Sequence, residues 1–108
     1  MQLSRSELVQ AYRQTRTIRD FEERVHEEFA AGHIPGLAHL YAGEEASGVG
    51  FCMHLKDGDY IASTHRGHGH CIAKGCDVRG MMHEISAARR ARAAARAARC
   101  TSPIWPRE

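Results

Sequence analysis

Mostly apolar side chains recur along the first third of the chain at the spacing of one helix face. They stand three, four or seven residues apart, which is the repeat of a buried helical stripe. The stripe comprises Leu8, Tyr12, Thr15, Ile18, Val25 and Phe29, with Phe21 beside it, and charged residues such as Arg19, Glu22, Glu23, Arg24, Glu27 and Glu28 are placed on the other faces. The pattern predicts an amphipathic helix of about 25 residues, which requires a large partner to pack on.

Both ends of this helix are marked in the sequence. Ser4 and Glu7 form a capping-box pattern, in which the two side chains satisfy free amides of the first turn. Gly32 is suited to a left-handed cap at the other end, and Pro35 prevents the helix from continuing.

Shorter elements follow a loop over residues 36–43. The pattern predicts a helix over 44–55, a turn at 57–59, a short strand over 60–63, a short helical stretch over 71–74, and a helix over 78–85 that Asp77 caps. These elements are small beside the first helix, so the domain is expected to extend over residues 1–85 around that helix.

The pattern changes after Ile85. From residue 86 to 99 the chain consists of Ala and Arg apart from Ser86, and it offers no apolar stripe larger than Ala. Residues 1–85 carry nine Lys/Arg against twelve Asp/Glu, a formal charge of −3, whereas residues 86–108 carry six Arg and one Glu, a formal charge of +5. The tail over 86–108 is therefore predicted to be helical or disordered and to lie outside the domain.

The composition favours a cytosolic globular protein. No apolar run approaches the roughly 20 residues that cross a bilayer, and the first five residues lack the apolar core of a secretory signal. The four cysteines are then expected to be reduced thiols. We therefore expect a cytoplasmic protein with no membrane partner.

The segment from Ser63 to His70 carries the chemistry of the sequence. It reads Ser-Thr-His-Arg-Gly-His-Gly-His and follows the predicted strand. Glycines let backbone amides approach an anion, and Arg offers a planar fork for phosphate oxygens. The segment fits a phosphate or diphosphate site, and a polar surface turn of the same spacing stays open as an alternative. The histidines, with Cys71 and Cys76, lack the ligand spacing of zinc sites, so no metal site is predicted.

Four ordered blocks of the sequence resemble the alpha subunit of the first component of 2-oxo acid dehydrogenase complexes. The blocks are Thr17–Arg24, Gly32–Gly36, His39–Ala46, and Ser63–His70 with Ala73–Gly75 after it, and the resemblance covers roughly residues 8–85. Glu44 and His65 stand where the pyruvate enzymes usually carry Gln and Tyr, and in this the chain is similar to acetoin dehydrogenase alpha chains.

The resemblance implies a fold, a cofactor and partners. The fold is α/β, and this chain would supply the amino-terminal, mostly helical portion of the thiamine-diphosphate-binding fold, incomplete. The cofactor is thiamine diphosphate. Arg66 and His65 would bind its diphosphate, and His39 would line the active site near its reactive ring. His68 and His70 are given structural roles. The family oxidises or decarboxylates its substrate and passes the acyl group to lipoamide, as an alpha-two beta-two assembly with a beta subunit and a lipoyl acyltransferase component.

The magnesium site of the family is missing from this sequence. Family members hold the ion with a Gly-Asp-Gly motif and a later Asn, and no Gly-Asp-Gly occurs in the 108 residues. Family members also continue into a Gly-Gly-Ser-Met-His-Ile-Ala-Asp stretch. Codons can be chosen for residues 96–106 that encode this same stretch when they are read in a shifted frame. We interpret residues 86–108 as frameshifted, and we expect the chain alone to be inactive and to supply no catalytic residue.

Two non-enzymatic functions stay open beside this one. A small basic protein could bind nucleic acid through the Arg-rich tail, although the tail has no aromatic residues interleaved with its charges. Alternatively, residues 1–85 could dock on a beta subunit without taking part in catalysis.

Overall fold

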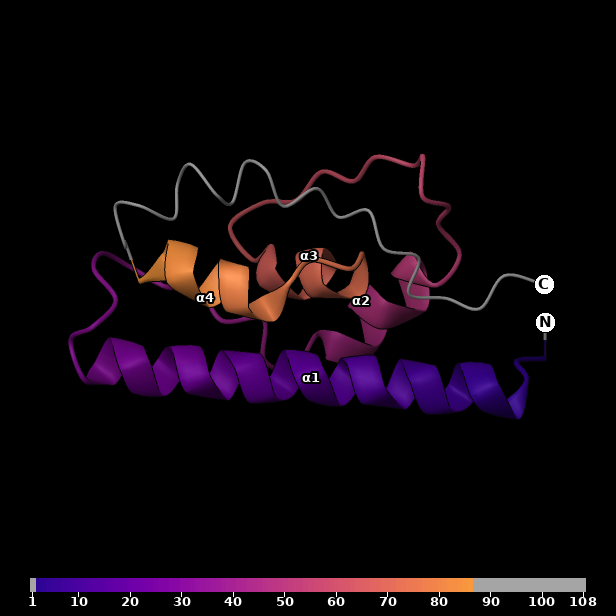
Figure 1. The fold of residues 1–108 in the computed structure, drawn as a ribbon, viewed down its shortest axis with the longest axis horizontal. Helices are drawn as coiled ribbons and strands as arrows, with labels where there is room; N and C mark the ends of the chain where they lie inside the picture. Colours follow the sequence, from indigo (N-terminus) through magenta and orange to yellow (C-terminus); the bar gives the residue numbers. More distant parts are fainter. Residues whose placement is uncertain (1, 87–108) are drawn as a thin grey trace.

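The computed structural model describes residues 2–86 as four helices joined by loops (Figure 1). They are α1 (Arg5–Ala30), α2 (Glu45–Cys52), α3 (His68–Ala73) and α4 (Val78–Ile85). The predictions for residues 87–108 lie outside this part. The mostly helical amino-terminal portion is thus observed, whereas the α/β class of the whole fold stays a prediction.

The strand predicted over residues 60–63 is wrong. Residues 2–86 contain no strand, and 60–63 form an irregular loop in which the side chain of Tyr60 is 100% exposed. A strand needs a neighbour to accept and donate its ladder hydrogen bonds, and no other extended segment lies beside this one within the described residues.

The two ends of α1 form as the sequence predicts. The Ser4 hydroxyl accepts a hydrogen bond from the Glu7 amide at 3.3 Å, and the Glu7 carboxylate accepts one from the Ser4 amide at 2.7 Å, which completes the capping box. Gly32 has φ of 79°, a left-handed conformation that glycine adopts without strain.

Only the middle of α1 is buried. α2 and α3, with 8 and 6 residues, cover the central turns of a helix of 26 residues (Figure 1). Ile18 and Val25 are fully buried there, whereas Leu8, Tyr12 and Phe29 are exposed by 54%, 71% and 37%. The predicted buried stripe is therefore right at its centre and wrong at its ends, because no described element covers the ends.

One charged residue lies on the buried face instead of a solvated one. Glu22 was predicted to face solvent, but it is 0% exposed and packs between the turns of Ile18 and Val25. Its spacing of four residues from Ile18 and three from Val25 places it on their face. The prediction is wrong because it was based on the charge of Glu22 and not on its position in the helical repeat.

Tyr41 is the centre of the core between α1, α2 and α3. Its side chain is 2% exposed and fills the space next to two glycines. A Cβ atom at Gly48 would lie 2.4 Å from the Tyr41 hydroxyl oxygen, and one at Gly69 would lie 2.2 Å from its Cδ1 atom. The loop that carries Tyr41 can lie against α2 and α3 because both helices present a glycine at this point.

The remaining helices differ from their predicted bounds. α2 is shorter than the predicted 44–55, and α3 begins at His68, ahead of the predicted 71. α4 has the predicted cap, with the Asp77 carboxylate accepting from the Gly80 amide at 2.7 Å, but none of its residues is buried.

The cysteines are not all in the same state. Cys52 and Cys71 are free thiols, as predicted, whereas Cys76 is disulfide-bonded, so the prediction of a reduced thiol is wrong there. Among the described residues, no helix is both long and apolar enough to cross a membrane.

Candidate functional site

The candidate site centres on residues 63–67, which we call the histidine turn. It connects the exposed loop after α2 to the first residue of α3. The Ser63 hydroxyl bonds the Nδ1 atom of His70 at 2.8 Å and donates to the Arg66 carbonyl oxygen at 3.4 Å. The turn is thus folded back on the first turn of α3.

The structure brings the three predicted cofactor-binding residues together. The rings of His39 and His65 meet edge to face, with centroids 4.8 Å apart and planes at 77°. The Arg66 guanidinium donates from Nη1 to the carbonyl oxygen of Leu40, the residue after His39. Both imidazoles are exposed and Arg66 is half-buried. Two segments far apart in sequence therefore form one polar surface with a fixed positive charge.

His68 and His70 point into the protein. His68 places Nδ1 2.9 Å from Oε1 of the buried Glu22, and its ring lies edge-on to Phe21 with centroids 5.7 Å apart. His70 lies edge-on to Tyr41 at 5.1 Å. Their contacts connect the histidine turn to the core.

Glu45 holds the loop that carries His39. Its carboxylate accepts from Arg19 Nε at 2.6 Å, and both of its oxygens accept from the Gly43 amide at 3.0 Å. The hydrogen bond from Arg19 lowers the pKa of Glu45 to about 2, although burial acts to raise it. The carboxylate therefore stays charged and links α1, the 36–43 loop and α2.

Sequence reasoning did not single out Glu22, Arg19 or Glu45 for these contacts. The available signal was the position of Glu22 on the apolar face of α1, because a carboxylate there needs a polar partner.

The arrangement fits a diphosphate better than a metal ion. A guanidinium and two imidazoles that can donate hydrogen bonds are suited to phosphate oxygens. No group of three His, Cys, Asp or Glu side chains within residues 2–86 is arranged to hold a metal ion. Arg66 and His65 would suit the diphosphate end of a cofactor, with His39 beside them, and we assign no step to magnesium.

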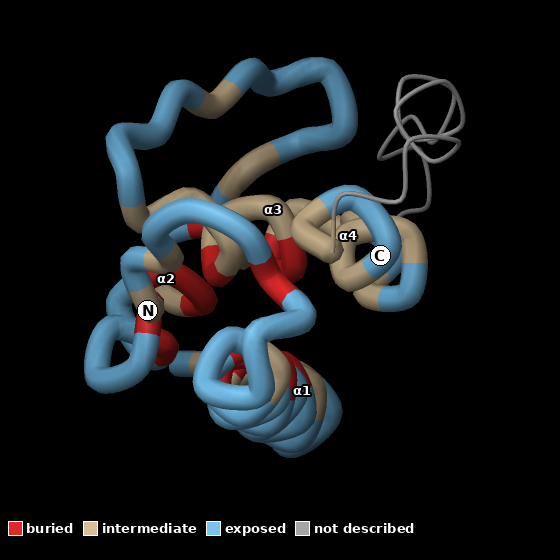
Figure 2. Tube along the Cα trace, turned by 90° about the vertical axis from the view of Figure 1, so that its left-hand side faces the viewer, coloured by how far each residue is buried: buried red, intermediate tan, exposed pale blue. Residues whose placement is uncertain are grey.

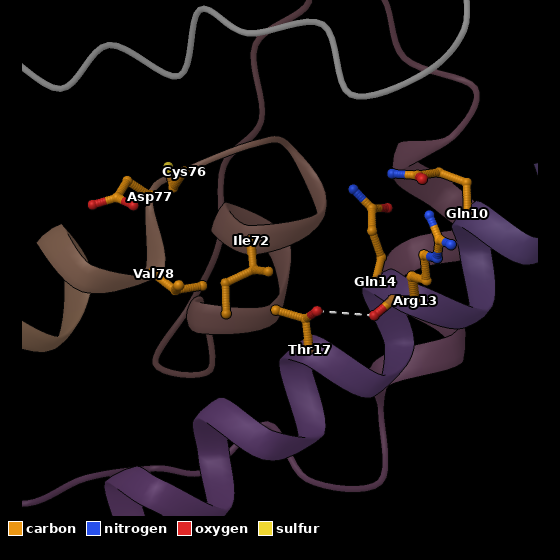
Figure 3. A pocket seen from close by; sticks show the side chains of 8 residues that line it. All are labelled: Gln10, Arg13, Gln14, Thr17, Ile72, Cys76, Asp77 and Val78. Atoms are coloured by element: carbon orange, nitrogen blue, oxygen red, sulfur yellow. Dashed lines mark hydrogen bonds between the residues drawn. The ribbon is translucent and has the colours of Figure 1, made fainter.

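Two pockets of the described part lie elsewhere along α1, one beside α3 and the start of α4 and the other beside α4. One of about 290 Å³ is lined by Gln10, Arg13, Gln14, Thr17, Ile72, Cys76, Asp77 and Val78 (Figure 3). The other, of about 350 Å³, is lined by Thr17, Asp20, Phe21, Arg24, Val78, Arg79 and Met82. Neither of these two pockets includes His39, His65 or Arg66. His39 and His65 are exposed and Arg66 is half-buried, so a small molecule bound by them would need further protein to enclose it.

A family model described as "Dehydrogenase E1 component" matches residues 13–102. The match extends past residue 85, into the segment that the sequence pattern assigns to a separate tail. The boundary at residue 85 and the frameshift stay predictions.

Curated relatives match the same region. The acetoin:2,6-dichlorophenolindophenol oxidoreductase alpha subunit of Cupriavidus necator is 66% identical over 83 residues, which are 77% of this chain and 25% of the relative. The subunit of that name from Bacillus subtilis is 60% identical over 85 residues, 79% of this chain and 26% of its own. The pyruvate dehydrogenase E1 component alpha subunit of Rhizobium meliloti is 40% identical over 88 residues, 82% of this chain and 25% of its own. The chain spans about a quarter of the length of these relatives, and no solved structure matches it.

Proposed function

The chain belongs to the dehydrogenase E1 component family, and from this premise we propose that it forms the amino-terminal part of the alpha subunit of a thiamine-diphosphate-dependent oxidoreductase. The observation that supports the proposal most is the convergence of His39, His65 and Arg66 on one exposed surface. The family resemblance assigns these three residues to the cofactor from the sequence alone.

Acetoin is the substrate that we propose for the complete enzyme. The two acetoin-type relatives are 66% and 60% identical to the chain, against 40% for the pyruvate-type relative from Rhizobium meliloti. His65, one of the residues in which the chain is similar to acetoin dehydrogenase alpha chains, lies in the candidate site, and Glu44, the other, is the N-cap residue of α2. A 2-oxo acid such as pyruvate is the alternative within the same reaction class. The matches give no support to the nucleic-acid-binding alternative.

Each of the three candidate residues would have its own role in binding the cofactor. Arg66 would bind the diphosphate through the guanidinium hydrogens that its bond to Leu40 leaves free, because an Arg side chain offers five donors. His65 would donate a further hydrogen bond from the exposed side of the turn. His39 would line the site next to the reactive ring of the cofactor, whose ylid attacks a carbonyl group when the cofactor is bound.

The 108-residue chain alone should not bind the cofactor tightly. It has no Gly-Asp-Gly motif for magnesium, and its candidate residues lie on an open surface. Calorimetric titration of the purified chain with thiamine diphosphate and magnesium should show no micromolar binding, and a micromolar, magnesium-dependent isotherm would contradict this. A beta subunit, in an alpha-two beta-two assembly, and a lipoyl acyltransferase would be the partners of the whole enzyme, in the cytoplasm.

A chimera tests the proposed function directly. Residues 4–86 of this chain replace the aligned segment in the alpha subunit from Cupriavidus necator, and the product is co-expressed with the beta subunit of that enzyme. We expect assembly and reduction of 2,6-dichlorophenolindophenol with acetoin at a rate within about tenfold of the parent, because 66% of the 83 aligned residues are identical.

The matched control is the same chimera assayed with pyruvate, which should be turned over more slowly than acetoin. An assembled chimera that is inactive with both substrates would contradict the proposed function, and a preference for pyruvate would contradict the choice of acetoin.

A further inference from the structure

Two polar contacts hold α3 against α1, one at each end of α3. At its first residue, His68 Nδ1 lies 2.9 Å from Glu22 Oε1. At its last residue, the Ala73 carbonyl oxygen accepts from Gln14 Nε2 at 3.4 Å. Glu22 is 0% exposed and Gln14 is 6% exposed, whereas the side chain of His68 is 25% exposed, so the first contact is part-buried and the second is buried. α1 thereby fixes where α3 begins and ends.

The first of these contacts lies two residues from Arg66. The peptide between them is held as well, because the Gly67 carbonyl oxygen accepts from the Cys71 amide at 3.0 Å in the first turn of α3. The residues before Arg66, from 62 to 65, are exposed. The position of the Arg66 backbone therefore depends on the α3 side, where His68 is tied to Glu22.

Burial of the Glu22 carboxylate on this face of α1 is energetically unfavourable. One of its oxygens, Oε2, is buried without a hydrogen-bond partner among residues 2–86. A buried carboxylate with incomplete hydrogen bonding loses more hydration than it regains, and an apolar residue of similar size is often at least as stabilising. Packing alone gives no reason for a carboxylate here.

We propose that Glu22 is a positioning residue for the histidine turn: through His68 it fixes the start of α3 and, with it, the guanidinium of Arg66 beside Leu40. The inference rests on the proposed function for the meaning of Arg66, but the placement of Arg66 is a property of the chain itself. Glu22 does not touch the cofactor in this account.

The chain contains a matched pair that should lack this role. Glu28 and His33 lie 2.6 Å apart, also as carboxylate and Nδ1, but five residues apart in sequence and near the end of α1. His33 is 67% exposed and Glu28 is 23% exposed, so the pair is local and solvated. It provides a control with the same chemistry and no connection to α3.

The test compares Glu22→Leu, Glu22→Gln and Glu28→Leu in the full 108-residue chain. Thermal unfolding followed by circular dichroism reports the stability of the fold. Nuclear magnetic resonance reports two local quantities: hydrogen exchange at the Cys71 amide and the signals of the Arg66 guanidinium hydrogens, which are resolved when the group is hydrogen-bonded.

For Glu22→Leu we expect a small fall in the melting temperature, because His68 Nδ1 loses its acceptor, together with about tenfold faster exchange at the Cys71 amide and loss of the resolved Arg66 signals. Glu22→Gln retains an acceptor for His68 and should keep exchange within about threefold of the parent chain. Glu28→Leu should change neither local quantity. A folded Glu22→Leu chain with parental exchange and parental Arg66 signals would overturn the proposal, since a merely structural residue predicts that outcome or a fall in stability alone.

A measurement without substitution covers the case in which Glu22→Leu does not fold. Nitrogen-15 spectra of the parent chain report which ring nitrogen of His68 carries a hydrogen. We expect a hydrogen on Nδ1 that exchanges slowly, and a ring protonated on Nε2 alone would overturn the proposal. None of these readouts involves the cofactor, so their failure leaves the proposed function standing, and an inactive chimera leaves this inference standing.

Discussion

α3 and α4 follow each other in the sequence, yet the protein holds them differently. α3 has 6 residues, two of them histidines and one a glycine, and three of the six are buried. α4 has 8 residues with a clear apolar face and a side-chain cap, and none is buried (Figure 2). Helix propensity and periodicity favour α4, whereas tertiary contacts hold α3. The candidate site is attached to the helix that depends on the rest of the fold.

The glycines of the two helices should give the largest contrast. Gly69→Ala on α3 would place a Cβ atom 2.2 Å from the Tyr41 ring, which cannot move without disturbing the core. We expect a loss of about 3 kcal/mol or more in the free energy of unfolding. Gly80→Ala on α4 meets only the Asp77 carboxylate, at 3.2 Å, and gains helix propensity, so it should change stability by less than about 1 kcal/mol. Urea unfolding measures both, and equal losses would break the comparison.

Apolar side chains of the two helices should differ in the same direction. Ile72 on α3 is 4% exposed and belongs to the core, whereas Met82 on α4 is only partly buried. Ile72→Ala should cost about 2–4 kcal/mol, and Met82→Ala should cost less than about 1.5 kcal/mol. Calorimetric melting temperatures check the order, and a larger loss for Met82→Ala would show that α4 contributes more to the fold than its burial indicates.

Acid should weaken the side of the molecule that carries His39. The pKa of Glu45 is lowered from 4.5 to about 2, chiefly by the hydrogen bond from Arg19. Its stabilisation is thus complete above pH 4.5 and is lost as the pH falls towards 2. We expect a loss of about 2 kcal/mol, since Arg19 is partly solvated.

Urea unfolding of the parent chain and of Glu45→Gln between pH 6 and pH 2 measures this loss. The substituted chain should be less stable at pH 6 and should show a flatter dependence on pH over this range. Parallel curves would exclude Glu45 as the source of the acid sensitivity.

The sequence predicts what local chemistry determines. The capping box of α1, the left-handed Gly32 and the Asp77 cap depend on residues within a few positions of one another, and all three form as predicted. The early start of α3 depends on Glu22, which is 46 residues away from His68, so no local pattern reveals it. The strand over 60–63 failed for a related reason, since a strand exists only with a partner.

The candidate site divides in the same way. Resemblance to a family selected His39, His65 and Arg66, and the structure brings them together. Of the residues that hold them, Glu22 was assigned to a solvated face and Glu45 was given no role in the site, because a sequence shows charge without burial. Their contacts become visible only when α1 is packed against α2 and α3.

The most direct test of the central claim compares Arg66 with an arginine of α4 in the active chimera. Arg66→Ala removes the guanidinium of the histidine turn, and Arg79→Ala removes an exposed guanidinium on α4. The measured quantity is the KM for thiamine diphosphate at fixed magnesium, with acetoin as substrate. A lost charged contact to phosphate predicts a rise of about 100-fold for Arg66→Ala and a change of less than about twofold for Arg79→Ala. Equal KM values for the two variants would contradict the assignment of the histidine turn to the diphosphate.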